Sequence, residues 1–200
     1  MNDEQANPND CSVDQPKIAM DTIGIVSNIE GQPYKDIKRL WTLFERKYDS
    51  KAVQAYSHPH ICYQAAKTSN AGELKKDLRH LILQIRPFEI EVNGLRHFRK
   101  DVIFLGVKKT RKLAAIHKLV HRFLEAHCQD LFELYFPEHW IPHITLAMED
   151  LSEDNFRRAW REFKGSNIRY KQRVHNVCMV KWHPNGKINI ARRYELSPGV

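Results

Sequence analysis

Pro59-His60-Ile61-Cys62-Tyr63 and Pro142-His143-Ile144-Thr145-Leu146 are two copies of one short pattern. Each copy begins with Pro-His-Ile and comes after a segment whose apolar residues recur at helical spacing. The alternation of polar and apolar side chains that follows is typical of a half-buried β-strand. We therefore expect a strand at each copy and a fold organised around this pair of strands.

The pattern also predicts which side chains share a face. Side chains at positions i and i+2 of a strand emerge on the same side of a sheet. His60 should therefore share a face with Cys62, and His143 with Thr145. The isoleucine between the two polar residues of each copy points the other way, into a core.

An imidazole beside a small hydrogen-bond donor, present twice, suits phosphoryl transfer. This reaction needs a base for the nucleophile, an acid for the leaving oxygen and donors for the non-bridging phosphate oxygens. Histidine can fill either proton-transfer role near neutral pH, and no metal is required. His60 and His143 are the candidate catalytic residues, and Thr145 and Cys62 are the candidate phosphate-binding residues.

Working outward from the two copies, the apolar spacing predicts helices and strands in mixed order, which is typical of an α+β protein with helices packed on antiparallel-rich sheets. The expected strands cover 22–27, 58–64, 88–92, 101–107, 139–147, 174–182 and 187–196, and the expected helices cover 34–48, 72–84, 111–128 and 152–163. Asn93-Gly94 is expected to form the turn that separates two of these strands, and Asn185-Gly186 predicts a tight hairpin turn.

Composition sets the class of partner and compartment. The chain has 200 residues, 42% of them hydrophobic, and a net charge of +8, which favours anionic partners such as phosphate esters. Residues 1–21 are polar and are expected to form a flexible tail, and residues 22–200 a single domain. The sequence has no secretory signal, no long apolar run and no Cys-x-x-Cys pair. We expect a cytoplasmic protein that keeps its cysteines reduced.

The two copies, together with the opening strand Ile23-Gly24-Ile25-Val26, resemble the two-histidine phosphoesterase superfamily of 2′-5′ RNA ligases and cyclic phosphodiesterases, whose members carry two His-x-Thr/Ser-x motifs. The resemblance in element order covers residues 22–196. It implies a bilobal fold of two pseudo-symmetric lobes, with antiparallel sheets, helices outside and a central cleft. It also implies metal-independent chemistry, without a cofactor, on 2′,3′-cyclic phosphate or 2′-5′ linkages of RNA or nucleotides. We expect a monomer that does not bind membranes.

Cys62 departs from the motif, which has Thr or Ser at this position, and a thiol is a weaker hydrogen-bond donor than a hydroxyl. Two alternatives follow: an enzyme with reduced activity, or an RNA- or nucleotide-phosphate-binding protein that has lost catalysis. A Cys62 nucleophile is a minor third alternative. Neighbours two apart on a strand point in parallel, whereas activation needs a hydrogen bond from base to sulfur.

Other histidines leave further choices open. His58 is either an accessory phosphate contact or an exposed residue at a strand edge, and we favour the latter. His117 and His121 have the i, i+4 spacing of a metal-binding pair, but no third ligand stands at a recognisable spacing. We interpret them as solvated surface.

Basic and aromatic residues near the motifs are equally ambiguous. The basic stretches 108–112 and 169–173 fit either an RNA-binding surface or ordinary solvated faces. Trp140 and Tyr63 adjoin the motifs, where they either stack on a base or fill the core.

Overall fold

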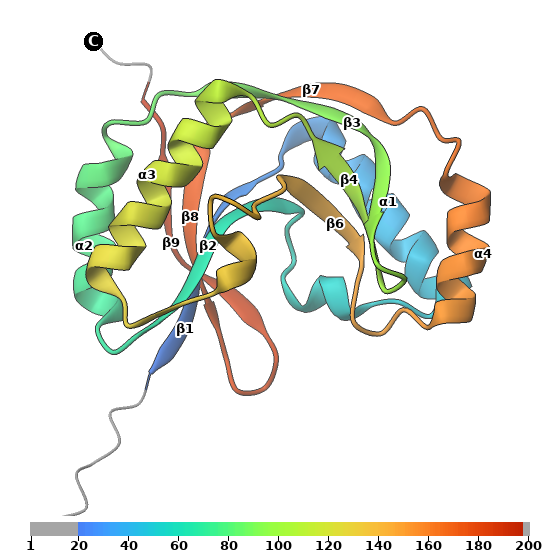
Figure 1. Ribbon diagram of the computed structural model, residues 1–200, viewed down its shortest axis with the longest axis horizontal. Coiled ribbons are helices and arrows are strands. Elements are labelled where there is room, and N and C mark those ends of the chain that lie inside the picture. Colours follow the sequence, from blue (N-terminus) through green and yellow to red (C-terminus); the bar gives the residue numbers. More distant parts are fainter. Residues whose placement is uncertain (1–19, 198–200) are drawn as a thin grey trace, which may run out of the picture.

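The computed structural model describes residues 20–197, which form two antiparallel sheets with helices on their outer sides (Figure 1). The strand orders are β5-β2-β1-β8-β9 in the first sheet and β6-β4-β3-β7 in the second. The elements are β1 (Asp21–Asn28), α1 (Gly31–Tyr48), the 3-10 helix η1 (Ala52–Ala55), β2 (His60–Thr68), α2 (Ala71–Ile82), β3 (Phe88–Phe98), β4 (Val102–Val107), α3 (Arg111–His127), β5 (Asp130–Leu131), the 3-10 helix η2 (Glu133–Tyr135), β6 (His143–Ala147), α4 (Glu153–Phe163), β7 (Arg169–Val174), β8 (Asn176–Trp182) and β9 (Ile188–Glu195). The α+β prediction is confirmed.

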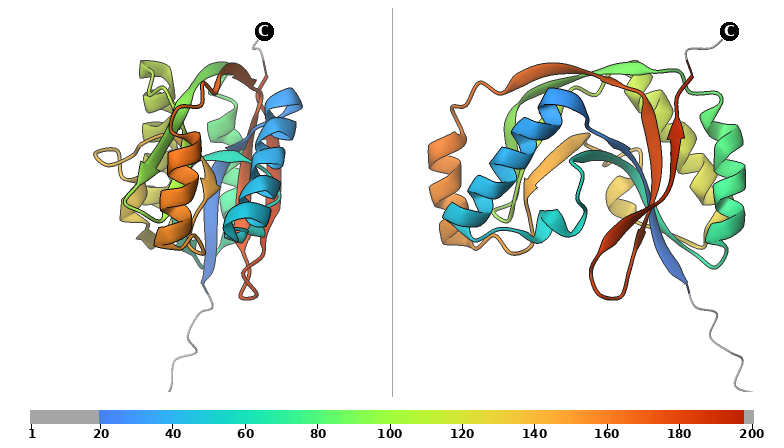
Figure 2. Two further views of the ribbon diagram at one scale, coloured as in Figure 1. Left: turned by 90° about the vertical axis from the view of Figure 1, so that its right-hand side faces the viewer. Right: turned by 180° about the vertical axis from the view of Figure 1, so that it is seen from behind.

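Each sheet carries one motif strand and two covering helices. Helices α2 and α3 cover the first sheet, which contains β2, and α1 and α4 cover the second, which contains β6 (Figures 1 and 2). The chain crosses between the halves more than once: α1 leaves β1 of the first sheet and packs on β6 of the second. Likewise α3 leaves β4 of the second sheet and packs on β2 of the first. The two halves are therefore interlocked.

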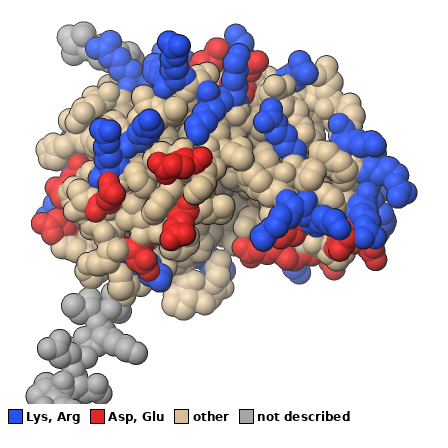
Figure 3. Space-filling view, in the orientation of Figure 1, with Lys and Arg blue, Asp and Glu red and all other residues tan. Residues whose placement is uncertain are grey.

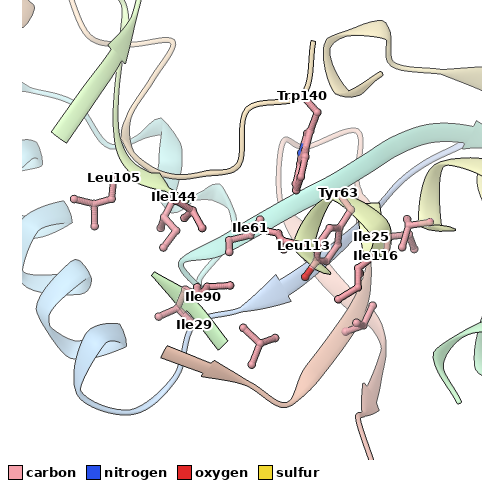
Figure 4. Packing of buried hydrophobic residues seen from close by; sticks show 14 of the residues in the cluster. Ile25, Ile29, Ile61, Tyr63, Ile90, Leu105, Leu113, Ile116, Trp140 and Ile144 are labelled. Carbon is pink, nitrogen blue, oxygen red and sulfur yellow. The ribbon is translucent and has the colours of Figure 1, made fainter. Parts of the chain in front are cut away.

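The isoleucine of each motif lies in the core, as the alternation predicts. Ile61 and Ile144 are both fully buried, and Figure 4 shows them among side chains from both sheets and from α3. Burying an aliphatic side chain of this size contributes about 1.5–3 kcal/mol. Because the isoleucine of each motif strand is held in the core, the side chains on the opposite face of the strand, which include the histidine, point away from the core.

The turn predicted at Asn93-Gly94 is wrong. β3 runs through this dipeptide, and the pairing of β3 with β4 shifts register between Val92 and Leu95. Gly94 has a φ of 72°, a left-handed value that glycine adopts without steric cost, so it forms a bulge inside the strand. The connection to β4 instead turns at Arg99 and Lys100.

The basic stretch 169–173 belongs to a strand that the sequence did not predict. Arg169–Val174 forms β7, which pairs with β3 at the edge of the second sheet. Its exposed lysine and arginine side chains alternate with half-buried residues. Charged side chains are common on edge strands, where they discourage pairing with other chains, and they hide the apolar alternation.

The short elements β5, η1 and η2 are also new, since two to four residues are too few to show a period. Of the tail predicted for residues 1–21, all but Met20 and Asp21 lie outside the described residues, and Asp21 already pairs with Thr68 in β1. No helix within residues 20–197 combines the length and the hydropathy needed to cross a bilayer.

Candidate active site

Both motif strands open onto one cavity of about 390 Å³. His60 and Cys62 reach it from β2, and His143 and Thr145 reach it from β6. The four residues singled out from the sequence are therefore brought together, although they come from different sheets. The same-face prediction holds in both strands, because the residues between them point into the core.

The two imidazoles are held by the same hydrogen bond. His60 Nδ1 donates to the carbonyl oxygen of His58 at 2.9 Å, and His143 Nδ1 donates to that of Ile141 at 2.7 Å. A carbonyl oxygen only accepts, so the proton of each neutral ring sits on Nδ1. Nε2 is left with an unshared lone pair and no hydrogen-bond partner among the described residues. Each ring is thus oriented as a base whose free nitrogen can serve the cavity.

Burial favours the neutral form of both imidazoles. It lowers the pKa of His60 to about 4, because a charged ring loses its hydration there, while the His58 carbonyl partly opposes the shift. The charge of a protonated His143 lowers the pKa of His60 further, so the two rings are close enough to interact. Burial also lowers the pKa of His143. An anionic ligand would raise both pKa values and favour protonation of one ring.

Two tryptophans hold the backbone of the motifs in matching ways. Trp140 Nε1 donates to the Cys62 carbonyl oxygen at 2.9 Å, and Trp41 Nε1 donates to the Thr145 carbonyl oxygen at 3.0 Å. Trp41 lies on α1, which packs on β6, and Trp140 lies shortly before the second motif histidine. In each motif strand, the carbonyl oxygen of the third residue thus accepts a hydrogen bond from an indole elsewhere in the chain.

Aromatic residues that the sequence did not mark flank the histidines. The Tyr56 ring stands edge-on to His60 at 5.0 Å, and the Phe98 ring stands edge-on to His143 at 5.2 Å. Both line the cavity, as do Tyr135 and Trp182. No sequence pattern marks these residues, because they lie on loops, on a 3-10 helix or at strand ends, without any spacing relation to the motifs.

The cavity is almost free of charged side chains. Glu149 is the one acidic residue among the described residues that line it, and none of these is a lysine or arginine. Glu149 adopts a φ of 59°, an unusual value for a residue with a Cβ. A phosphate in this cavity would be met by neutral donors and by a protonated imidazole, and the basic stretches 108–112 and 169–173 do not reach it.

Cys62 is poorly suited to act as a nucleophile. Burial raises the pKa of its thiol to about 12, so the thiolate is rare at neutral pH. Tyr135 lines the same cavity, and the phenol and the thiol influence each other's pKa. The cavity wall therefore holds both a neutral thiol and a phenol.

The interpretation of His117 as solvated surface is wrong. Its side chain is buried, its Nε2 donates to the Tyr135 carbonyl oxygen at 2.9 Å, and its ring stacks on Trp140 with 4.0 Å between centroids. His121 accepts a hydrogen bond from Gln64 Nε2 at 2.9 Å. Both histidines face β2, because α3 packs across that strand. Within residues 20–197 no three His, Cys, Asp or Glu side chains gather as metal ligands.

His58, Tyr63 and Trp140 also have defined places. His58 is half-buried rather than exposed, and its carbonyl, not its ring, serves the site. Tyr63 is a core residue whose hydroxyl bonds Ser27 Oγ at 2.8 Å. Trp140 is 2% exposed but still contributes to the cavity wall.

Residues 29–186 match the family model of the 2′-5′ RNA ligase superfamily. The chain therefore belongs to this superfamily. No curated protein sequence matches it.

Solved structures share the fold at low identity. Escherichia coli LigT complexed with 3′-AMP has a TM-score of 0.58 and 15% identity, over 90% of this chain and 99% of that chain. The protein TT0787 of Thermus thermophilus has a TM-score of 0.58 and 14% identity, over 89% and 98% respectively. A structure described as a phosphoesterase has a TM-score of 0.57 and 13% identity, over 88% and 99%. This chain is LigT-like in fold.

Proposed function

We propose that the protein is a metal-independent phosphoesterase that acts on 2′,3′-cyclic phosphate or 2′-5′ phosphodiester linkages of RNA or nucleotides. The observation that carries the proposal is the matched pair of imidazoles in one cavity, each with its proton fixed on Nδ1 and its Nε2 free. Family membership and the complex of LigT with 3′-AMP support a nucleotide ligand.

The geometry suits an acid and a base that exchange roles. In hydrolysis of a cyclic phosphate, one neutral imidazole takes a proton from water at Nε2 while the water oxygen bonds to phosphorus. The other imidazole, protonated, gives its proton to the ribose oxygen as the bond from phosphorus to that oxygen breaks. The product is a phosphomonoester beside a free ribose hydroxyl, and one water molecule is consumed. Thr145 donates its hydroxyl to a non-bridging oxygen, where charge accumulates.

The second candidate is a protein that binds RNA or nucleotide phosphates without turnover. Cys62 favours it, because a neutral buried thiol stabilises the transition state less well than a hydroxyl. Both candidates use the same cavity. They differ only in whether the bound ester reacts.

One experiment separates the candidates. Purified protein is incubated with adenosine 2′,3′-cyclic phosphate and with 2′-5′-linked diadenosine, each with and without excess EDTA, and the products are resolved by chromatography. We expect turnover that persists in EDTA, since two imidazoles supply both proton transfers. Loss of turnover on chelation, restored by a divalent ion, would contradict the metal-independent mechanism.

The control variants are His60→Asn and His143→Asn, which keep a polar side chain but remove the proton-transfer group. We expect each to lower kcat by about 10²–10⁴-fold, the usual contribution of general acid or base catalysis. Binding of adenosine 3′-monophosphate with no turnover in the wild-type protein would favour the binding function.

A further inference from the structure

Tyr135 brings a hydroxyl group to the cavity into which the first motif presents a thiol. Its side chain lines the cavity together with Cys62 and Thr145. The 3-10 helix η2, which ends at Tyr135, packs against β2, the strand that carries Cys62, and the phenol and the thiol influence each other's pKa. On the opposite motif strand, Thr145 presents its own hydroxyl to the same cavity.

The segment that carries Tyr135 is attached to the first motif strand itself. β5 pairs with β2, with Leu131 opposite Ala66, and Phe132 N then donates to the Ala65 carbonyl oxygen at 2.9 Å. The following 3-10 helix η2 ends at Tyr135, whose N–H donates to the Phe132 carbonyl oxygen at 3.0 Å. This path leads the chain along β2 from Ala66 toward Cys62.

A second set of contacts holds the backbones of Tyr135 and Cys62. His117 Nε2 donates to the Tyr135 carbonyl oxygen, and the His117 ring stacks on Trp140. Trp140 in turn donates from Nε1 to the Cys62 carbonyl oxygen. The backbones of Tyr135 and Cys62 are thus joined through the buried rings of His117 and Trp140. These contacts restrict the movement of one residue relative to the other.

The phenol is protonated and therefore able to donate. The neighbouring Cys62 and the burial of the ring raise the pKa of Tyr135 well above its ordinary value. A phenol donates a stronger hydrogen bond than a thiol.

We propose that the Tyr135 hydroxyl binds the phosphate group of the substrate and replaces the hydroxyl that Cys62 does not provide. Thr145 and Tyr135 then donate to the phosphate from the second and the first half of the molecule. This inference rests on the proposed function, since it assigns a phosphate contact in the same cavity.

The test combines Tyr135→Phe with two substitutions at position 62. Cys62→Thr restores a hydroxyl at the motif position, and Cys62→Val gives the shape of threonine without its hydroxyl. We expect Tyr135→Phe to lower kcat/KM by about 10²-fold, the effect of losing one donor in a transition-state site. Cys62→Thr should recover at least about tenfold of this loss in the Tyr135→Phe background, whereas Cys62→Val should recover none. In the wild-type background, Cys62→Val should lower kcat/KM less than Tyr135→Phe does, because Tyr135 still donates.

Two results would overturn the proposal. One is full activity in Tyr135→Phe. The other is a loss that Cys62→Thr and Cys62→Val repair equally or not at all, which indicates a purely structural tyrosine. Circular dichroism and thermal melts show whether each variant is folded, and the single Cys62→Val variant tests the idea without altering Tyr135.

Affinity separates this inference from the proposed function. Isothermal titration with adenosine 3′-monophosphate measures the same four variants without turnover, and the same order of losses and recovery is expected in Kd. If the wild-type protein binds this nucleotide but hydrolyses no ester, the enzymatic function is refuted. The Kd values of the variants then decide whether Tyr135 binds the phosphate. A wild-type protein that does neither refutes both.

Discussion

At the scale of single residues, the two histidines are distinguished by their surroundings rather than by their identity. Other histidines of the chain lie on strands or helices too, but His60 and His143 share a cavity, a bonded Nδ1 and a free Nε2. Burial lowers the pKa of both rings below the ordinary value. Both rings therefore gain a proton only at a lower pH than exposed histidines do.

This predicts the pH dependence of kcat/KM. One ring must be neutral and the other protonated in the free enzyme, so the profile is bell-shaped and centred between their two apparent pKa values. Because burial lowers both pKa values, to about 4 for His60, the centre should lie below pH 6.5. Initial rates at low substrate concentration between about pH 4 and 9 measure it. A maximum above pH 7 would contradict the assignment of these two rings as acid and base.

The Cys62 thiol should react slowly with alkylating agents. Its pKa is raised to about 12 by burial, and only the thiolate is nucleophilic. Peptide mapping by mass spectrometry after timed treatment with iodoacetamide at neutral pH should find Cys62 labelled much more slowly than a free cysteine peptide. Rapid labelling that abolishes turnover in parallel would instead support a covalent Cys62 mechanism.

At the scale of elements, α3 packs across β2. This packing places the buried His117 against Tyr135 and Trp140, which line the cavity. Ile116, Val120 and Leu124 recur at helical spacing and bury one face of α3, and His117 borders this face. Thr110 starts the helix by accepting a hydrogen bond from Leu113 N at 3.1 Å. His117 thereby reaches η2 and Trp140, which form part of the cavity wall.

This packing predicts acid sensitivity of the fold. Desolvation lowers the pKa of His117 to about 4. Between about pH 6.5 and 4, His117 is therefore protonated in the unfolded chain but neutral in the folded chain. The stability that a neutral His117 contributes is therefore complete above about pH 6.5 and falls, as the pH drops, by up to about 1.4 kcal/mol per pH unit. Urea unfolding at several pH values should show a shallower dependence for His117→Gln, which keeps an N–H donor and cannot titrate. Equal slopes in both proteins would contradict the burial of a neutral ring.

At the scale of the whole molecule, the lysine and arginine side chains of the described residues lie outside the lining of the candidate active site. The chain carries a net charge of +8, and lysine and arginine side chains are spread over the face seen in Figure 3. None of them is among the described residues that line the cavity. Positive charge at a distance from the cavity would attract an anion during its approach.

This separation predicts different salt dependences for long and short substrates. An oligoribonucleotide ending in a 2′,3′-cyclic phosphate carries many charges that interact with the basic surface, whereas a cyclic mononucleotide carries one. Raising NaCl from about 0.05 M to 0.5 M should therefore lower kcat/KM far more for the oligonucleotide. Plots of log kcat/KM against log salt give the two slopes. Equal slopes would show that the surface charge does not assist binding.

The sequence by itself determined the two motif strands and the face on which each side chain lies. Alternation along a strand is a local property, so the placement of His60 and Cys62 on one side of Ile61 needed no knowledge of the rest of the chain. The same holds for the amphipathic helices, whose spacing is read within a few turns. Four candidate site residues, which the structure brings to one cavity, followed from these local rules and from the family pattern.

Only the tertiary structure decided which other residues complete the site. Tyr135 belongs to a 3-10 helix of three residues, too short to show any period, and lines the cavity with Cys62 because β5 pairs with β2. His117 became a core residue because α3 crosses to the other sheet, although its helix pattern alone allowed an exposed position. Gly94 formed a bulge rather than a turn because its neighbours pair with β4 and β7 on both sides. Such contacts join segments far apart in the chain, and their free energy depends on packing that no local pattern records.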